Sequence, residues 1–505
     1  MSNKRRFFGS LDAARDERFE DHFVESLDLR RLQTNSSDVI YGAKGVGKTA
    51  LRRALCELYG SKYHTTTTID LDPISFSQVH VALSHLQDTV NTETVALASN
   101  TWRNVMAMHC LETVAGGLPV GDPLRRQIND LLAIEGFSGR NSNNRLIRQI
   151  EQIMIRIAEI GTDSGPTPLG VTERQREAAT GFPFNAQVRS LLAGCASLVE
   201  RTGKFVLICV DGFDSIVDHT KESRRVIFAG LIDAIFKCAA DPIMARAFCF
   251  KAFLPQELTD DAMVTLWDDD KNIYNTRYLR WSAEDFQQLL CRRMRPYSRT
   301  KSGDFNDVWH EYMPERIRNV AYGTDESSFA YILRHTLYRP RQLLTHVQNI
   351  IDEWDERSTS FRIDPSFIPR VVAETNVRLA RHVVSQLEIK HPGLRTFMQS
   401  WSGAPNVMGV REFQDKMRRV FGINDAVQLN DMFNDLFNGG IFGVKRQASS
   451  GQRHFRFGFA AGHIAEMHAA VEENDLVALS PMFHEYCGCV TSERGPILPE
   501  IAAAS

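Results

Sequence analysis

Apolar residues follow two kinds of pattern along this chain, and each predicts a different element. Residues 204–211 and 247–254 are short, continuous apolar runs, which are typical of strands buried on both faces of a parallel sheet. Residues 38–41 and 65–71 are bounded by polar or turn residues and predict two more strands. Segments with helical spacing, such as 102–114, lie between these runs. This alternation predicts an α/β domain with a mainly parallel sheet.

The second half of the chain has a different pattern. After residue 278 apolar runs become rare, and we expect a helical bundle over 280–355. A second helical region is expected after Pro365. It closes with a hairpin of residues 440–447 and 453–459, in which phenylalanines alternate with polar or small residues. Helices followed by a two-stranded ribbon predict a winged-helix-like domain.

The loop between the first predicted strand and its helix has the spacing of a phosphate-binding loop. Residues 42–49 read Gly-Ala-Lys-Gly-Val-Gly-Lys-Thr and fit G-x-x-x-x-G-K-[ST]. Glycines let backbone N–H groups point at phosphate oxygens. We expect Lys48 to reach the β and γ phosphates of ATP and the Thr49 hydroxyl to ligate Mg²⁺. The residues expected to hold the nucleotide are Gly42, Ala43, Lys44, Gly45, Val46, Gly47, Lys48, Thr49 and Ala50.

Asp211 ends the apolar strand 204–211, and a second acid, Asp214, follows three residues later. Ligands of parallel α/β sheets bind at the carboxyl ends of the strands, where Asp211 lies. We expect Asp211 to ligate Mg²⁺ and Asp214 to polarise the attacking water. The alternative for both is an acid at the start of a strand-to-helix turn, where Asp is common.

Arginines occur at two predicted helix ends. Arg339 and Arg341 flank a proline at the expected start of a helix, and Arg341 is a candidate to offset γ-phosphate charge. The alternative is a solvated pair. Residues 292–295 contain three arginines, of which one could act in trans as an arginine finger; a charged helix end is the simpler interpretation.

Basic residues of the C-terminal hairpin are candidates for contact with duplex DNA, with a solvated hairpin as the alternative. They are Lys445, Arg446, Arg453 and Arg456. The formal net charge of −3 predicts no broad attraction to nucleic acid or membrane. No apolar run approaches the ~20 residues of a membrane span. The nine cysteines contain no CxxC pair, which fits a reducing cytoplasm.

Together these elements resemble the AAA+/STAND-type P-loop ATPases. The chain is similar, more narrowly, to a bacterial branch of single-chain ATPases with a Tyr-Arg-Pro-Arg lid motif and a C-terminal winged helix. Members of that branch open with a Phe-Gly…Asp-Ala…Asp segment, here Phe8-Gly9, Asp12-Ala13 and Asp16. They end near a Phe-His-x-Tyr-like element, here Phe483-His484-Glu485-Tyr486.

The resemblance implies a switch driven by ATP and Mg²⁺, a homo-oligomer, and a separate effector protein as partner, often in anti-phage defence or DNA-transaction loci. Two departures favour tight binding with slow turnover. Gly212 stands where AAA+ members have Glu, and Ser215 where STAND-like members often have Glu. The leading hypothesis is an ATP-hydrolysing switch that activates an effector. The alternative is a non-hydrolysing, nucleotide-gated scaffold or DNA-binding subunit.

The expected fold class is α/β: a P-loop NTPase parallel-sheet core with a helical insertion, a helical lid and a C-terminal winged-helix-like domain. The expected domains are the P-loop ATPase domain (1–277, with the insertion at about 95–190), the lid (278–364), the winged-helix-like domain (365–489) and a flexible tail (490–505).

Overall fold

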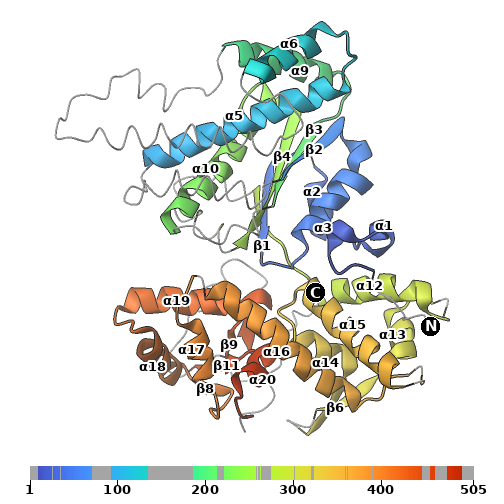
Figure 1. Cartoon of the computed structure of the whole chain (residues 1–505), viewed down its shortest axis with the longest axis vertical. Coiled ribbons are helices and arrows are strands. Elements are labelled where there is room, and N and C mark those ends of the chain that lie inside the picture. Colours follow the sequence, from blue (N-terminus) through green and yellow to red (C-terminus); the bar gives the residue numbers. More distant parts are fainter. Residues whose placement is uncertain are drawn as a thin grey trace. The chain divides into compact units, whose positions relative to one another are not determined.

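The computed structural model divides into two compact units, which we call the sheet unit and the helical unit (Figure 1). The sheet unit comprises Glu25–Lys44 and Lys48–Leu279, and the helical unit comprises Met1–Val24, Gly45–Gly47 and Arg280–Ser505. The structure describes residues 9–25, 27–34, 36–70, 92–134, 186–212, 221–256, 259, 262, 275–300, 302–319, 323–358, 360, 362–388, 390–445, 455–460 and 475–491.

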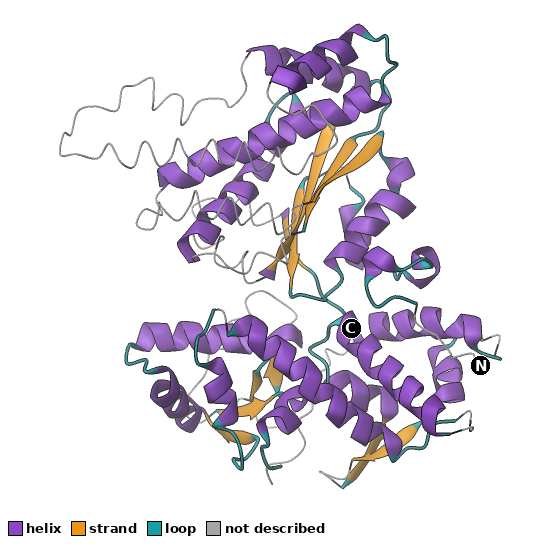
Figure 2. Ribbon diagram, viewed as in Figure 1, coloured by secondary structure: helices purple, strands orange, loops and turns teal. Residues whose placement is uncertain are grey.

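The sheet unit is built on five parallel strands in the order β2-β3-β4-β1-β5 (Figure 2). They are β1 (Asp38–Gly42), β2 (Thr65–Asp70), β3 (Val206–Asp211), β4 (Phe248–Pro255) and β5 (Thr276–Tyr278). The predicted α/β fold class is therefore confirmed, together with four of these strands. The fifth has only three half-buried residues, too few for a recognisable apolar pattern.

Helices lie on both faces of this sheet (Figure 1). The helices of this unit are α2 (Leu27–Leu32), α3 (Lys48–Arg53), α5 (Thr92–Gly117), α6 (Pro123–Ile134), α9 (Ala186–Glu200) and α10 (Lys221–Ala240), of which α6 and α9 pack on α5. A π-turn, η2 (Ala54–Leu58), continues α3, and the 3₁₀ turns η3 (Gly60–Lys62) and η6 (Met244–Arg246) complete the set. Of the expected helical insertion, residues 135–185 lie outside the described part of the chain.

The two faces of the sheet differ in chemistry. Side chains alternate along a strand, so Val206, Ile208 and Val210 share one face, where they join the main apolar core with α5 and α10. Cys209 and Asp211 share the opposite face, which α3 covers. Because α3 directly follows the loop of residues 42–47, this second, more polar face positions the candidate site.

A buried ion pair lies on the polar face between β1 and β4. Asp38 and Lys251 are directly opposite in the strand register, and both side chains are 0 % exposed. The Lys251 ammonium donates to the Asp38 carboxylate and, at 2.6 Å, to the carbonyl of Ser36. Arg277 on β5 approaches the other Asp38 oxygen at 3.3 Å. One charge cluster therefore joins three adjacent strands.

The first part of the helical unit contains the N-terminal segment and the helices expected for the lid. The elements are η1 (Ala13–Arg15), α1 (Phe19–His22), α12 (Ala283–Met294), η8 (Arg295–Tyr297), α13 (Phe305–Tyr312), α14 (Ser328–Arg334), α15 (Pro340–Arg357) and α16 (Phe367–Leu387). An antiparallel pair, β6 (Arg316–Asn319) and β7 (Thr324–Ser327), interrupts them. The expectation of helices alone over 280–355 missed this pair, because its residues are mostly polar and exposed.

The C-terminal part is winged-helix-like. Its antiparallel sheet has the order β10-β9-β11-β8. The strands are β8 (Val407–Gly409), β9 (Phe442–Lys445), β10 (Arg456–Phe457) and β11 (Leu476–Leu479). The helices and turns are α17 (Leu394–Gln399), α18 (Val410–Phe421), α19 (Ala426–Asn438), η9 (Gly458–Ala460), η11 (Pro481–Phe483) and α20 (His484–Cys487). Within the described residues, no helix is long and apolar enough to cross a bilayer.

We expect Asp38→Asn to lower the free energy of unfolding by about 3 kcal/mol, because it leaves the buried Lys251 ammonium without its counter-charge. Urea denaturation of the full chain measures the loss. The matched control is Asp233→Asn, which breaks a partly exposed pair with Lys237 on α10 and is expected to change stability by less than ~1 kcal/mol. Equal effects in the two variants would contradict a structural role for the buried pair.

Candidate nucleotide-binding site

The loop of residues 42–47 joins β1 to α3 and bends at two glycines. Gly45 has φ +86° and Gly47 has φ +107°, in the left-handed region that other residues adopt only with strain. This is the curled backbone that the sequence motif predicts for a phosphate-binding loop. The loop leaves β1 at its carboxyl end, the edge at which α/β sheets bind ligands.

The Lys48 side chain points back toward the first residues of the loop, which belong to the sheet unit. Its ammonium is buried and donates to the carbonyl oxygens of Gly42, at 2.9 Å, and Ala43, at 3.2 Å. An ammonium group has three donors and no acceptor, so it suits an anion as well as these carbonyls. The contacts hold a positive charge beside the loop backbone.

Asp211 ends β3 on the face covered by α3. Its carboxylate accepts hydrogen bonds from Arg52 Nε, at 2.8 Å, and from the backbone N–H of Gly212, at 2.9 Å. Arg52 also donates to the Thr68 hydroxyl on β2, at 3.2 Å. The predicted magnesium ligand is thus tied to the first turns of α3 by a charged residue that the sequence analysis did not select. Its only sequence signal is its place three residues after Thr49, on a helix expected to pack on the sheet.

Trp281 lies at the apex of the loop. Its indole Nε1–H donates to the carbonyl of Val46 at 2.7 Å, and its ring stacks on Phe286 of α12 with centroids 5.3 Å apart. A methyl group built on Gly47 would lie 3.6 Å from the same indole. Sequence reasoning missed Trp281, because no motif surrounds it. Residues 45–47, Trp281 and α12 all belong to the helical unit.

Arg341 also lies beside the loop apex. A methyl group built on Gly45 would lie 3.6 Å from its Cβ. Its side chain is 49 % exposed, and its guanidinium is 3.9 Å from the Asp12 carboxylate, a long and solvated ion pair. The structure therefore places the predicted sensor arginine and an acid of the N-terminal segment together.

Backbone strain occurs just before Arg339-Pro340-Arg341. Tyr338 has φ +52°, the one positive φ at a non-glycine residue in the described part of the chain. Its buried ring contacts Phe286 and Phe459, with centroids 5.7 and 5.5 Å away. Burial raises the pKa of Tyr338 to about 12, so the phenol stays neutral. Strain of this kind persists where the surrounding packing holds it, and it often accompanies functional segments.

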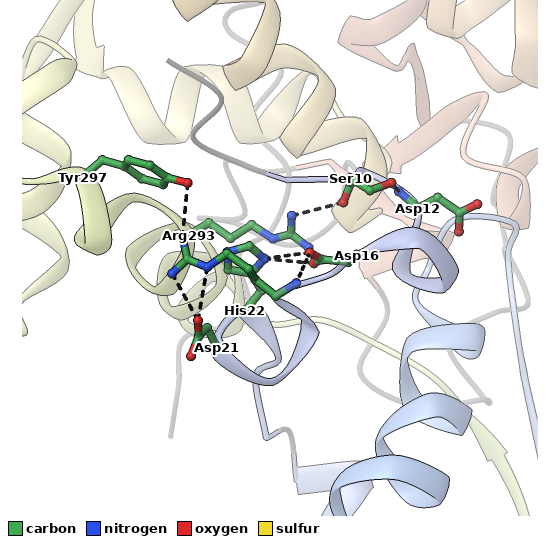
Figure 3. Close-up of polar contacts among 8 residues, drawn as sticks. Ser10, Asp12, Asp16, Asp21, His22, Arg293 and Tyr297 are labelled. Atoms are coloured by element: carbon green, nitrogen blue, oxygen red, sulfur yellow. Dashed lines mark hydrogen bonds and ion pairs between the residues drawn. The ribbon is translucent and has the colours of Figure 1, made fainter. Parts of the chain in front are cut away.

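The N-terminal segment is fixed to α12 by Asp16 (Figure 3). The Asp16 carboxylate contacts His22 Nδ1 at 2.9 Å and Arg293 Nη2 at 3.0 Å, and it accepts the backbone N–H of Arg18 at 3.2 Å. Burial raises the pKa of Asp16, but the hydrogen bond with His22 and the charge of Arg293 outweigh it, so the pKa lies below its usual value. Arg293 lies in the last turn of α12, as expected for a charged helix end, but its side chain is buried in this network rather than exposed.

Three predicted site residues lie outside the described part of the chain: Asp214, Arg446 and Arg453. The other two hairpin cations lie over aromatic rings. Lys445 Nζ is 5.9 Å from the ring centroid of Phe455, and the Arg456 guanidinium is 5.7 Å from that of Phe437. Among the described residues, no group of three or more His, Cys, Asp or Glu side chains could hold a metal ion by itself.

Comparison with known proteins gives one family match. Residues 284–374 match the model of the FunZ-associated C-terminal helical domain, a stretch that runs from α12 into α16. No curated protein matches the chain.

Three solved structures from Aeropyrum pernix resemble it over most of its length. The ORC2 protein in its ADPNP-ADP complexes is 10% identical, with 96% of each chain covered and a TM-score of 0.39. The ORC1 protein in complex with DNA is 11% identical, with 92% of this chain and 93% of that chain covered and a TM-score of 0.35. The ADP form of ORC2 is 12% identical, with 95% and 94% covered and a TM-score of 0.32. TM-scores below 0.5 carry no functional assignment to this chain.

We expect Trp281→Phe to increase amide hydrogen exchange of residues 45–47 about fivefold, because the ring stacking remains while a hydrogen bond worth about 1 kcal/mol is lost. Peptide-level exchange measured by mass spectrometry tests this. Trp354→Phe is the control, since it removes the same kind of bond, to the Ser360 carbonyl at 2.8 Å, elsewhere in the helical unit. Unchanged exchange in the Trp281 variant would show that the indole does not hold the loop.

Proposed function

We propose that this protein is a magnesium-dependent, ATP-binding and ATP-hydrolysing switch that activates a partner effector. The observation that carries the proposal is the loop of residues 42–49: a glycine-bent turn at the carboxyl end of β1, with a buried lysine ammonium in it and a carboxylate bound to the following helix. We also propose the four domains expected from the sequence, with the loop in the first and Arg341 in the lid.

In this proposal Lys48 exchanges the carbonyls of Gly42 and Ala43 for β- and γ-phosphate oxygens. Thr49 and Asp211 would hold Mg²⁺, since a hydroxyl and a carboxylate are the hard oxygen donors that this ion takes together with phosphates and water. The ion would neutralise charge that develops on the phosphates. Binding of Mg²⁺ by Asp211 would depend on Arg52, because the guanidinium already binds one oxygen of the Asp211 carboxylate.

Arg341 is proposed as the γ-phosphate sensor, because its half-exposed guanidinium could exchange a long ion pair with Asp12 for phosphate. Asp214 is proposed to polarise the attacking water. The Arg52–Asp211 pair also favours the second candidate, a non-hydrolysing nucleotide-gated scaffold or DNA-binding subunit. A carboxylate that shares its charge with an arginine binds Mg²⁺ less strongly, which favours slow turnover.

The proposed partners follow from the resemblance to P-loop ATPases and from the positive charge of the C-terminal hairpin. We propose a homo-oligomer, a separate effector protein in an anti-phage or DNA-transaction pathway, and duplex DNA along the basic hairpin. Lys445 and Arg456 would contact phosphates together with Arg446 and Arg453.

Steady-state ATP turnover tests the leading proposal. We expect Lys48→Ala and Asp211→Asn each to lower turnover at least about 100-fold, because phosphoryl transfer depends on positioning and charge neutralisation. Lys204→Ala is the control, since this exposed lysine donates to the Ser61 carbonyl, at 2.8 Å, near the opposite end of β3. Duplex DNA is expected to stimulate turnover, and a Lys445→Ala/Arg456→Ala variant to reduce that stimulation. ATP binding without any turnover above the Lys48→Ala blank would favour the scaffold.

Arg52→Ala is expected to lower the Mg²⁺ concentration for half-maximal ATP binding about tenfold, since the guanidinium no longer competes for Asp211 through a bond to a charged group. Arg53→Ala is the matched control, because that neighbour pairs with Glu57 at the surface. A Mg²⁺ titration of ATP binding measures the shift. A rise in the required Mg²⁺ would mean instead that Arg52 orients the carboxylate for the ion.

A further inference from the structure

Two cysteines lie in contact between α3 and the sheet. Cys56 belongs to the π-turn that continues α3, Cys209 lies in β3, and their Sγ atoms are 3.7 Å apart. A disulfide bond is about 2.05 Å long, so the sulfurs must approach by less than ~2 Å. All nine cysteines of the chain fall among the described residues, and all are free thiols.

Two side-chain contacts join α3 and its π-turn to β3. The first is the ion pair of Arg52 with Asp211, and the second is the contact between the two thiols. Cys56 follows Arg52 by four residues, about 6 Å along a helix, and Cys209 precedes Asp211 by two residues, about 6.6 Å along a strand. The two spacings match, so the helix and the strand keep both pairs in register. A displacement of the π-turn at the Cys56–Cys209 contact therefore also displaces Arg52 relative to Asp211.

The two thiols differ in access and reactivity. Cys56 is half-buried, whereas Cys209 is 0 % exposed and meets Cys56 directly. The hydrogen bond with Cys209 lowers the pKa of Cys56 to about 7, with help from the charge of Arg52 and against the effect of burial. The thiolate is the nucleophilic form of cysteine. Burial raises the pKa of Cys195 and Cys238 to about 12, so these thiols stay protonated.

We propose that a hydroperoxide oxidises Cys56 and Cys209 to a reversible disulfide, and that this bond weakens nucleotide binding by the adjacent loop. The modification itself is independent of the proposed function, whereas its effect on nucleotide rests on it.

The chemistry balances in two steps. The Cys56 thiolate attacks one peroxide oxygen, the O–O bond breaks, and Cys56 becomes a sulfenic acid while hydroxide takes a proton to leave as water. The Cys209 sulfur then attacks the Cys56 sulfur. The S–O bond breaks, and the departing hydroxide takes the Cys209 proton as a second water. Two thiols lose two electrons, and one hydrogen peroxide is reduced to two waters.

The disulfide draws the π-turn toward β3. Lys48 and Thr49 lie in the first turn of α3, so this displacement shifts both residues relative to the phosphates they are proposed to bind. Displacements of about 1 Å commonly change such interactions by one to two orders of magnitude. We therefore expect the nucleotide affinity of the oxidised protein to be about tenfold lower.

The test of the modification uses the full chain and hydrogen peroxide, followed by thiol blocking and peptide mass spectrometry. We expect a linked Cys56–Cys209 peptide that disappears on reduction with dithiothreitol. It should be absent from Cys56→Ser and present in Cys195→Ser, the control at a buried thiol of α9. In Cys209→Ser, Cys56 should accumulate as a sulfenic acid that dimedone traps. Wild-type protein in which Cys56 stays reduced or becomes sulfinic acid, with no linked peptide, would overturn the proposal.

The test of the consequence compares ATP affinity in the oxidised and reduced states. We expect a tenfold loss on oxidation of wild type, restored by dithiothreitol, and no loss in Cys56→Ser. An unchanged affinity in protein shown to carry the disulfide would overturn the regulatory part. Reduced protein that binds no nucleotide would instead refute the proposed function, while the peptide map still decides whether the disulfide forms.

Discussion

Asp38 and Lys251 constrain the sheet that carries the loop. Both charges are fully buried, and each would be strongly destabilising without the other, so β1 and β4 have one favourable register. Because β4 lies between β1 and β3, that register fixes the end of β1, and with it the loop of residues 42–47, relative to the end of β3. Asp211 then meets Arg52 one helical turn after Lys48. The site geometry in the sheet unit depends on a charge pair at the other end of the same strand.

The elements predictable from sequence are those whose signal is local. Continuous apolar runs identified four strands of the sheet, and the glycine spacing of residues 42–49 identified the loop. Arg52 and Trp281 were missed, because their partners are 159 and 235 residues away in the chain and no local pattern encodes such contacts. The sequence analysis did not select Lys251, because it lies inside the apolar run 247–254. A charge buried at such a position requires a partner. Arg293 was expected only as a charged helix end, because its partner Asp16 lies 277 residues away in the N-terminal segment.

The C-terminal Phe-His-x-Tyr-like element packs within the helical unit rather than around the loop. Burial lowers the pKa of His484 to about 4, so its ring is neutral, and Nε2 lies 3.0 Å from the Leu479 carbonyl. Glu485 accepts a hydrogen bond from Asn376 of α16 at 3.1 Å. These contacts connect α20 to the winged-helix sheet and to α16. Residues 483–486 thus have a structural explanation in their own packing, and this explanation needs no contact with nucleotide.

Trp281 gives this protein a spectroscopic property that follows from one hydrogen bond. The Trp281 side chain is half-buried, with its N–H bound to a loop carbonyl and its ring stacked on Phe286. Movement of the loop apex would release that N–H to solvent and shift the tryptophan emission to longer wavelength. The chain has six tryptophans, so the difference between wild type and a phenylalanine variant would isolate this signal. The emission of Trp281 would therefore report movement of the loop apex without an added dye.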